Sequence, residues 1–218
     1  MRIRVGYMKK HFWKIEYSIT LMVIFAVFLL IVPISFSSHE AKFISKWNET
    51  YNNVDYMFSA MSAQADSDIV KGIKNATSYD KRELLMIQMV KPYLRLEENE
   101  FLISRYKQHL MNGKCVTKDD LYYFDNLYYS KTNKIVGIKD IMNERENTPG
   151  FMMMFDMNGI KGPNTWGKDI YGIKIYSDGK IAALGKGLSA NEMKNDCSAT
   201  GTGISCSYFY RIGGEFNE

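Results

Sequence analysis

The chain has 218 residues, of which 46% are hydrophobic and 14% aromatic, and its formal net charge is +4. This length and composition suit one globular domain with a sizeable core. The basic excess is small and lies mostly near the N-terminus, which excludes the basic footprint typical of a nucleic-acid-binding protein. We therefore expect no nucleic-acid partner.

The N-terminal segment combines basic residues with a long apolar run. No charged residue occurs from Tyr17 to Ser38, and about 20 apolar helical residues suffice to span a bilayer. Basic residues precede the run and His39-Glu40 follow it, which favours a cytoplasmic N-terminus. We predict a basic leader over residues 1–11 and a transmembrane helix over 12–36. A removable signal peptide is the alternative, but its apolar core would be shorter, about 7–15 residues.

Glu16 lies at the edge of this apolar run. An ionisable side chain inside a membrane segment is a candidate functional residue. The alternative is that Glu16 lies within a turn of the interface and extends its carboxylate into water. Hydropathy alone leaves both interpretations open.

The order of residues in this segment, K-K-H-F-W-K-I-E followed by the apolar run and Pro33, resembles the class III leader of type IV prepilins and type II secretion pseudopilins. If Phe12 is the first mature residue, Glu16 is the fifth and Pro33 the twenty-second. The resemblance implies a single-pass protein of the bacterial inner membrane whose prepilin peptidase cuts before Phe12, which is then N-methylated. It also implies that Glu16 pairs with the free amine of a neighbouring pilin-like subunit.

The processing site departs from the family pattern. His11 replaces the leader glycine, and Trp13-Lys14 replace the usual Thr-Leu. The chain is therefore similar to the family with a divergent cleavage site, and whether the peptidase acts between His11 and Phe12 stays open.

Beyond the apolar run, residues 37–66 are predicted to form an amphipathic helical stalk, and residues 67–218 an extracytoplasmic head. Apolar side chains in the stalk recur at spacings of three and four, which is typical of an amphipathic helix; these are Ile44, Trp47, Tyr51, Val54, Phe58, Met61 and Ala65. A plain juxtamembrane helix or coiled-coil stalk is the alternative. The family resemblance implies that this helix packs on the head.

The head begins with predicted helices. Ser78 is a possible N-cap, residues 84–90 form a short helix that stops around Pro92, and Glu98–Met111 form another closed by Asn112-Gly113. Residues 115–149 are rich in tyrosine and are expected to form weak strands or short helices. A half-buried sheet face is the favoured interpretation of the tyrosines, and a binding surface the alternative.

Strands dominate the C-terminal third. Residues 151–155 follow Pro149-Gly150 and are uniformly apolar, which indicates a buried strand. Residues 170–176 and 180–184 flank Ser177-Asp178-Gly179, and Asp-Gly between apolar runs is a strong hairpin signal. We therefore predict an α+β fold with an antiparallel sheet.

The loop from 156 to 169 carries Asp156, Asn158, Asn164 and Asp169 within a D-x-N-G…G-P-N…G-x-D pattern. This loop is similar to one in pilin-like proteins, which implies a possible Ca²⁺ site. Calcium takes six to eight oxygen ligands, so main-chain carbonyls and water would have to complete the shell. The alternative, which we favour, is a turn held by Asx hydrogen bonds and glycines.

The chain has three cysteines, of which Cys197 and Cys206 bracket a short run of small residues. In an extracytoplasmic compartment a disulfide between them is expected. It would fasten a last strand, predicted over Ser205–Ile212. Cys115 is then left over, although sequence alone does not fix the connectivity.

Enzymatic function is not expected. The sequence lacks the G-x-S-x-G, HExxH and phosphate-loop patterns, and its three histidines are scattered. The expected function is a structural pilin-like subunit that assembles through its N-terminal helix into a type IV pilus or a secretion pseudopilus. The alternative is a monomeric, single-pass membrane-anchored binding or sensor domain.

Overall fold

The computed structural model describes residues 3–64, 73, 78–98, 104–141, 150–176 and 178–215, without the side chains of 3–16, 28–40, 79 and 80. Residues 1–42 and 43–218 form two compact units. The elements are helices α1 (Ile3–Gln64), α3 (Tyr79–Leu94), α5 (Ala190–Asp196), α6 (Cys206–Phe209) and η1 (Tyr210–Ile212), and strands β1 (Leu96–Glu97), β2 (Leu127–Ser130), β3 (Ile135–Asp140), β4 (Phe151–Asp156), β5 (Ile170–Ile175) and β6 (Ile181–Ala183).

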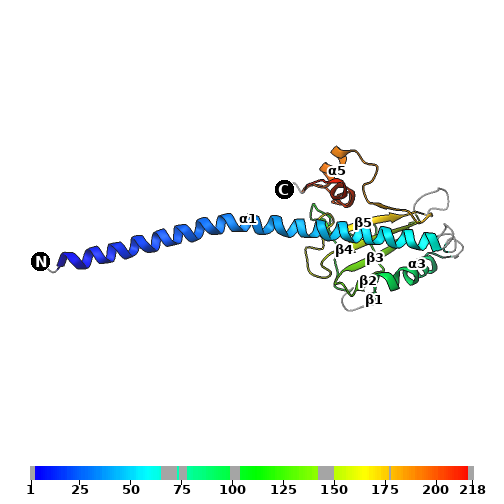
Figure 1. The fold of residues 1–218 in the computed structure, drawn as a ribbon, viewed down its shortest axis with the longest axis horizontal. Coiled ribbons are helices and arrows are strands. Elements are labelled where there is room, and N and C mark those ends of the chain that lie inside the picture. The colour runs from blue at the N-terminus through cyan, green and yellow to red at the C-terminus, as the bar shows by residue number, and fades with distance from the viewer. Residues whose placement is uncertain are drawn as a thin grey trace. The chain divides into compact units, whose positions relative to one another are not determined.

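The second unit is built on a six-stranded sheet in the order β1-β2-β3-β4-β5-β6. Every neighbouring pair is antiparallel, so the sheet is a simple meander. Together with the helices this gives an α+β fold, as predicted. Figure 1 shows α1, in cyan, and α3, in green, running across the sheet within this unit.

Side chains on successive strand positions point to opposite faces, and β4 shows this clearly. Phe151, Met153 and Phe155 join the core beneath the two helices. Met152 and Met154 join a second core on the other face, which loops cover. Because β4 is central and buried on both faces, its sequence is uniformly apolar rather than alternating.

The predicted stalk helix is present, and from Phe43 onward it belongs to the head unit. Its apolar positions are those of the predicted stripe: Trp47, Val54, Phe58 and Met61 are buried in the core under the helices, and Ile44 and Tyr51 pack against it. Ala65 lies outside the described residues. The helix therefore supplies part of the core of the head.

The predicted strands at 151–155 and the 170–184 hairpin are confirmed by β4, β5 and β6. Gly179 takes a φ of 79° in the hairpin turn, a conformation that glycine adopts without steric cost. Tyr128 and Tyr129 are half-buried on β2, in agreement with the sheet-face interpretation. Ser78 is the N-cap residue of α3, which is longer than predicted and contains Pro92 in its last turn.

Two predicted elements are wrong. In the described part of 98–111, residues 104–111 form turns and a bridge instead of a helix. Their main-chain groups bond distant segments: His109 N–H donates to Asn164 O at 2.9 Å and Met111 N–H to Thr202 O at 3.0 Å. The predicted strand Ser205–Ile212 is instead α6 followed by η1, because its N–H groups pair locally, as from Phe209 to Ser205 O at 3.0 Å.

Candidate functional site: a buried aspartate pair between β4 and β5

Two of the predicted site residues are buried carboxylates at facing strand ends. Asp156 is the last residue of β4, and Asp169 directly precedes β5. Asp156 is paired in register with Ile170, the neighbour of Asp169. Both aspartates have no exposed surface. The antiparallel register therefore brings the two carboxylates to the same end of the sheet, with the loop 157–168 between them.

Main-chain and hydroxyl donors occupy all four carboxylate oxygens of the pair. Asp156 accepts a hydrogen bond from the Tyr106 hydroxyl at Oδ2 (2.7 Å) and from Asn158 N–H at Oδ1 (3.0 Å). Asp169 accepts from Asn164 N–H at Oδ2 (2.9 Å) and from Thr165 N–H at Oδ1 (2.6 Å). A carboxylate that binds nearby main-chain N–H groups holds a turn in place. The pair is thus the hydrogen-bonded centre of the loop.

The two asparagines complete the loop. Asn158 donates through Nδ2 to Gly162 O at 3.2 Å, while its Oδ1 is buried without a hydrogen-bond partner. Asn164 adopts a φ of 49°, a left-handed conformation that asparagine tolerates better than most residues. The Asn164 amide orientation that satisfies its oxygen and nitrogen places the nitrogen 3.3 Å from Asp156 Oδ2. The structure therefore brings all four predicted residues together.

Burial sets the electrostatics of the pair. Burial, and then the charge of Asp169, raise the pKa of Asp156 well above its ordinary value. Burial also raises the pKa of Asp169, to about 6, although its main-chain hydrogen bonds act in the opposite direction. The pKa of Tyr106 is raised well above its ordinary value by burial and by the Asp156 charge. Two carboxylates so close together in a buried site favour a state that retains a proton.

The donor set limits the chemistry of the pair. Among the described residues, no group of three or more His, Cys, Asp or Glu side chains is placed to hold a metal ion. A hard cation would have to displace the donors that now bind the carboxylates, and would need further oxygen ligands. Asp156, Asn158, Asn164 and Asp169 would supply side-chain oxygens for such an ion. The calcium site therefore stays a prediction, and the observed contacts are those of a hydrogen-bonded turn.

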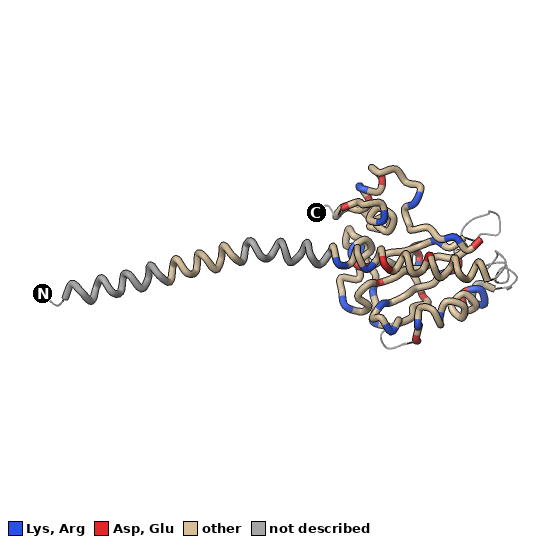
Figure 2. Tube along the Cα trace, viewed as in Figure 1, with Lys and Arg blue, Asp and Glu red and all other residues tan. Residues whose placement is uncertain are grey.

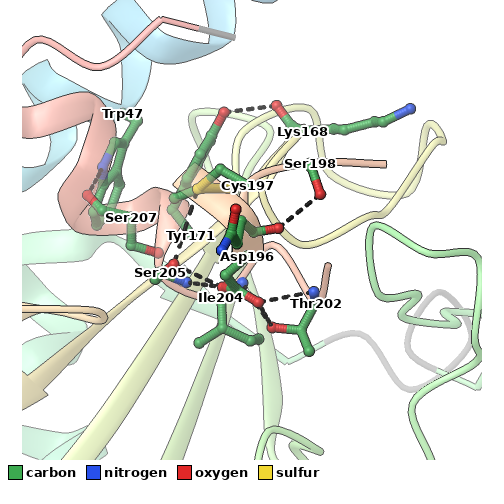
Figure 3. Close-up of a disulfide and its surroundings, with 12 residues drawn as sticks. Trp47, Lys168, Tyr171, Asp196, Cys197, Ser198, Thr202, Ile204, Ser205 and Ser207 are labelled. Carbon is green, nitrogen blue, oxygen red and sulfur yellow. Dashed lines mark hydrogen bonds between the residues drawn. A yellow bond between two sulfur atoms is a disulfide. The ribbon is translucent and has the colours of Figure 1, made fainter. Parts of the chain in front are cut away.

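The second predicted site is the Cys197–Cys206 pair, which the structure joins as a disulfide. Figure 3 shows the disulfide beside Asp196, whose carboxylate accepts hydrogen bonds from the loop that follows it. Asp196 accepts from Thr202 N–H and Ser205 N–H, both at 2.8 Å. Although burial raises the pKa of Asp196, the hydrogen bonds from Thr202 and Ser205 outweigh burial and lower it. Cys115 is free and exposed.

The disulfide segment is attached to α1 and to β5. Trp47 Nε1 donates to Ser207 O at 2.8 Å, and the Ser207 hydroxyl accepts from Gly172 N–H at 2.9 Å. Trp47 also stacks on Tyr171, with ring centroids 5.2 Å apart (Figure 3). Arg211 lies over the ring of Tyr51 at 4.0 Å. The C-terminal segment therefore fixes the position of α1 on the sheet.

The predicted leader and assembly residues lie in α1, but the side chains of His11, Phe12, Glu16 and Pro33 are outside the part of the chain that the structure describes. Their roles in leader processing and assembly therefore stay predictions. Tyr106 was missed by the sequence interpretation, because its contact with Asp156 is 50 residues away and no local pattern indicates it.

Comparisons with protein-family models, with curated proteins and with solved structures return no match. Across the described residues, no helical segment combines the length and the apolar character that a bilayer crossing requires.

Proposed function

We propose that the chain is a pilin-like structural subunit that is anchored in the bacterial inner membrane and assembles through its N-terminal helix into a type IV pilus or a secretion pseudopilus. The observation that carries this proposal is the division of α1 into two kinds of surface. Apolar side chains between Tyr17 and Val27 are exposed, whereas the large apolar side chains between Phe43 and Met61, except Tyr56, are buried in the head core or packed against it.

The exposed stretch of α1 needs an apolar environment. Its exposed large side chains are Tyr17, Ile19, Leu21, Met22, Val23, Ile24, Phe25 and Val27. Figure 2 shows that this part of the helix carries no charged residue. Contiguous exposed apolar surface of this kind indicates contact with lipid or with other chains. A pilin-like subunit uses such a helix for both, first in the membrane and then against neighbouring subunits.

The fold of the head also supports this proposal. An antiparallel sheet packs against the C-terminal part of the long helix, and a disulfide closes the C-terminal segment. These features agree with the resemblance carried by Phe12, Glu16 and Pro33. They do not depend on whether the leader is cut after His11.

A second candidate is a monomeric, membrane-anchored binding or sensor domain. The specific observation in its favour is a cavity of about 290 Å³ in the head, beside Lys134. In this case Glu16 is an interfacial residue without a role in assembly.

Mass spectrometry of the mature N-terminus, together with filament assembly by Glu16 variants, tests the proposal. We expect N-methylated Phe12, and we expect Glu16→Ala to abolish assembly while the chain stays in the membrane. The matched control is Glu49→Ala, an exposed carboxylate on the same helix. A wild-type protein that stays monomeric, keeps its leader and behaves in the same way after Glu16→Ala would refute the pilin-like function and leave the anchored binding domain.

A further inference from the structure

The head contains a cavity of about 290 Å³. Thr50 and Asn53 of α1 line one side, and Tyr93 and Arg95 at the end of α3 line another. Lys134, next to β3 in the β2–β3 hairpin, completes the lining. Ligand pockets in proteins are about 300–1,000 Å³, so this cavity lies just below the lower limit of the range and suits only a small ligand.

Two cations that line the cavity have no carboxylate partner among the residues that the structure describes. The half-buried Lys134 donates from Nζ to Thr50 Oγ1 at 2.7 Å, and the Thr50 hydroxyl donates to Lys46 O at 2.7 Å. An ammonium group has three donors, so two donors of Lys134 have no partner among the described residues. Neither Lys134 nor Arg95 forms an ion pair with a described carboxylate.

Lys131, a neighbouring cation outside the cavity, does have a carboxylate partner, unlike Lys134 and Arg95 among the described residues. Lys131, in the same hairpin, lies 3.1 Å from the Glu97 carboxylate. Burial lowers the pKa of Lys134, and the charge of Glu49 opposes this effect only in part. A half-buried ammonium with incomplete hydrogen bonding is costly unless an anion or water completes its shell.

The floor of the cavity is apolar. Val54, Val136 and Phe155 line it from the core, and because each is 1% exposed they offer a ligand little surface of their own. The Tyr93 side chain is 53% exposed at the end of α3 and offers an aromatic surface. The cavity thus joins an apolar floor to a cationic and hydroxyl-bearing wall, the usual composition of a site for a small amphipathic ligand.

We propose that this cavity binds a small organic anion, a carboxylate or a phosphate monoester that carries one apolar group about the size of a phenyl ring. The anionic group pairs with the free donors of Lys134 and with Arg95, and the apolar group lies against the exposed ring of Tyr93. This proposal is independent of filament assembly.

Binding of simple probes to the full-length chain in a neutral detergent tests the proposal. Isothermal titration calorimetry would compare 3-phenylpropionate, phenyl phosphate, the neutral 3-phenylpropanamide and inorganic phosphate. We expect saturable one-to-one binding of at least one aromatic anion, and binding of the amide at least about tenfold weaker, because charge-assisted hydrogen bonds are lost. Which aromatic anion binds more tightly identifies the carboxylate or the phosphate as the preferred group.

Variants separate the site from general electrostatics. Lys134→Met and Arg95→Asn should each weaken the binding of the aromatic anion by about tenfold. Lys131→Met removes the same charge from the same hairpin outside the cavity, and should leave binding unchanged. Arg95 is exposed, so the Arg95→Asn variant keeps the test valid if Lys134→Met fails to fold, as judged by circular dichroism.

Three results would each overturn the proposal. These are no saturable binding of either aromatic anion, equal binding of the neutral amide, or an equal loss of binding in Lys131→Met. Inorganic phosphate bound as tightly as phenyl phosphate would also overturn it, because the contact with Tyr93 would then contribute nothing.

Discussion

The indole Nε1 of Trp47 donates a hydrogen bond to the main-chain carbonyl of Ser207 at 2.8 Å, across 160 residues of sequence. Trp47 is fully buried, and its ring stacks on Tyr171. This single side chain therefore connects the helix α1, the strand β5 and the disulfide-closed C-terminal segment.

The first prediction follows from this contact. Trp47→Phe retains an aromatic ring but leaves Ser207 O without its donor, and should lower the free energy of unfolding by about 1–2 kcal/mol. Trp47→Ala also removes the packing, and should lower it by about 3–5 kcal/mol. Urea denaturation of the head, followed by circular dichroism, measures both.

Tyr56→Ala is the control on the same helix, because Tyr56 is 78% exposed and its loss should change the unfolding free energy by less than about 0.5 kcal/mol. Equal effects at both positions would show that Trp47 does not fix α1.

The second prediction concerns the disulfide. Breaking the Cys197–Cys206 bond in a Cys197→Ser, Cys206→Ser double variant should destabilise the head by about 2–3 kcal/mol, because the unfolded chain regains the entropy of the short loop. Thermal unfolding with and without reductant checks this. The wild type should lose stability in reductant, and the double variant should be insensitive to it. Cys115→Ser should behave as the wild type, since Cys115 is free; a reductant response that requires Cys115 would contradict the pairing.

The third prediction is a pH dependence set by the aspartate pair. Burial raises the folded-state pKa of Asp169 to about 6, above the unfolded value of about 3.9. Between about pH 4 and 6 the folded state therefore binds more protons than the unfolded state. The stabilisation that the protonated Asp169 contributes is complete below about pH 4 and is lost as the pH rises through about 6. A shift of this size corresponds to at most about 2–3 kcal/mol. Asp156, with its pKa raised in the same direction, adds to the effect.

Unfolding free energies measured between pH 4.5 and 8, a window chosen around these values of about 4 and about 6, give the test. Asp169→Asn should flatten the decline, because the titrating group is gone, whereas Asp125→Asn at an exposed position should leave it unchanged. Stability that rises with pH across this window, and does so less in Asp169→Asn, would mean that the carboxylate is stabilised in its charged form.

The fourth prediction distinguishes a hydrogen-bonded turn from a calcium site. Since all four carboxylate oxygens of Asp156 and Asp169 already accept hydrogen bonds, millimolar Ca²⁺, the range used by weak extracellular sites, should not change the melting temperature. The measurement is thermal unfolding with added Ca²⁺ and with a chelator. A calcium-dependent rise that disappears in Asn158→Ala would show that the loop opens to bind the ion.

The sequence predicts local features of this fold better than its long-range contacts. The Asp178-Gly179 turn and the buried strand β4 depend on neighbouring residues, and both were predictable. The stripe through Trp47 and Phe58 predicted the buried face of α1 for the same reason.

Contacts between distant segments could not be predicted. The segment around His109 has helix-forming neighbours, but its main chain pairs with residues near Asn164 and Thr202 instead. Residues 205–212 were predicted to form a last strand, yet this segment forms short helices beside the disulfide. At the candidate site, the four loop residues were predictable from their spacing, whereas Tyr106 was not. The cavity beside Lys134 was also not predictable, because it is formed by three elements that meet only in the folded chain.

Because α1 contributes Phe43, Trp47 and Val54 to the core of the head, the N-terminal boundary of the folding unit lies inside a helix and not in a linker. Proteolysis or truncation on the N-terminal side of Phe43 should release an intact head. A cut a few turns later would remove a wall of the core and expose the apolar face of the sheet to solvent. The head should therefore stay folded after it is cut from its N-terminal segment only if the cut lies before Phe43.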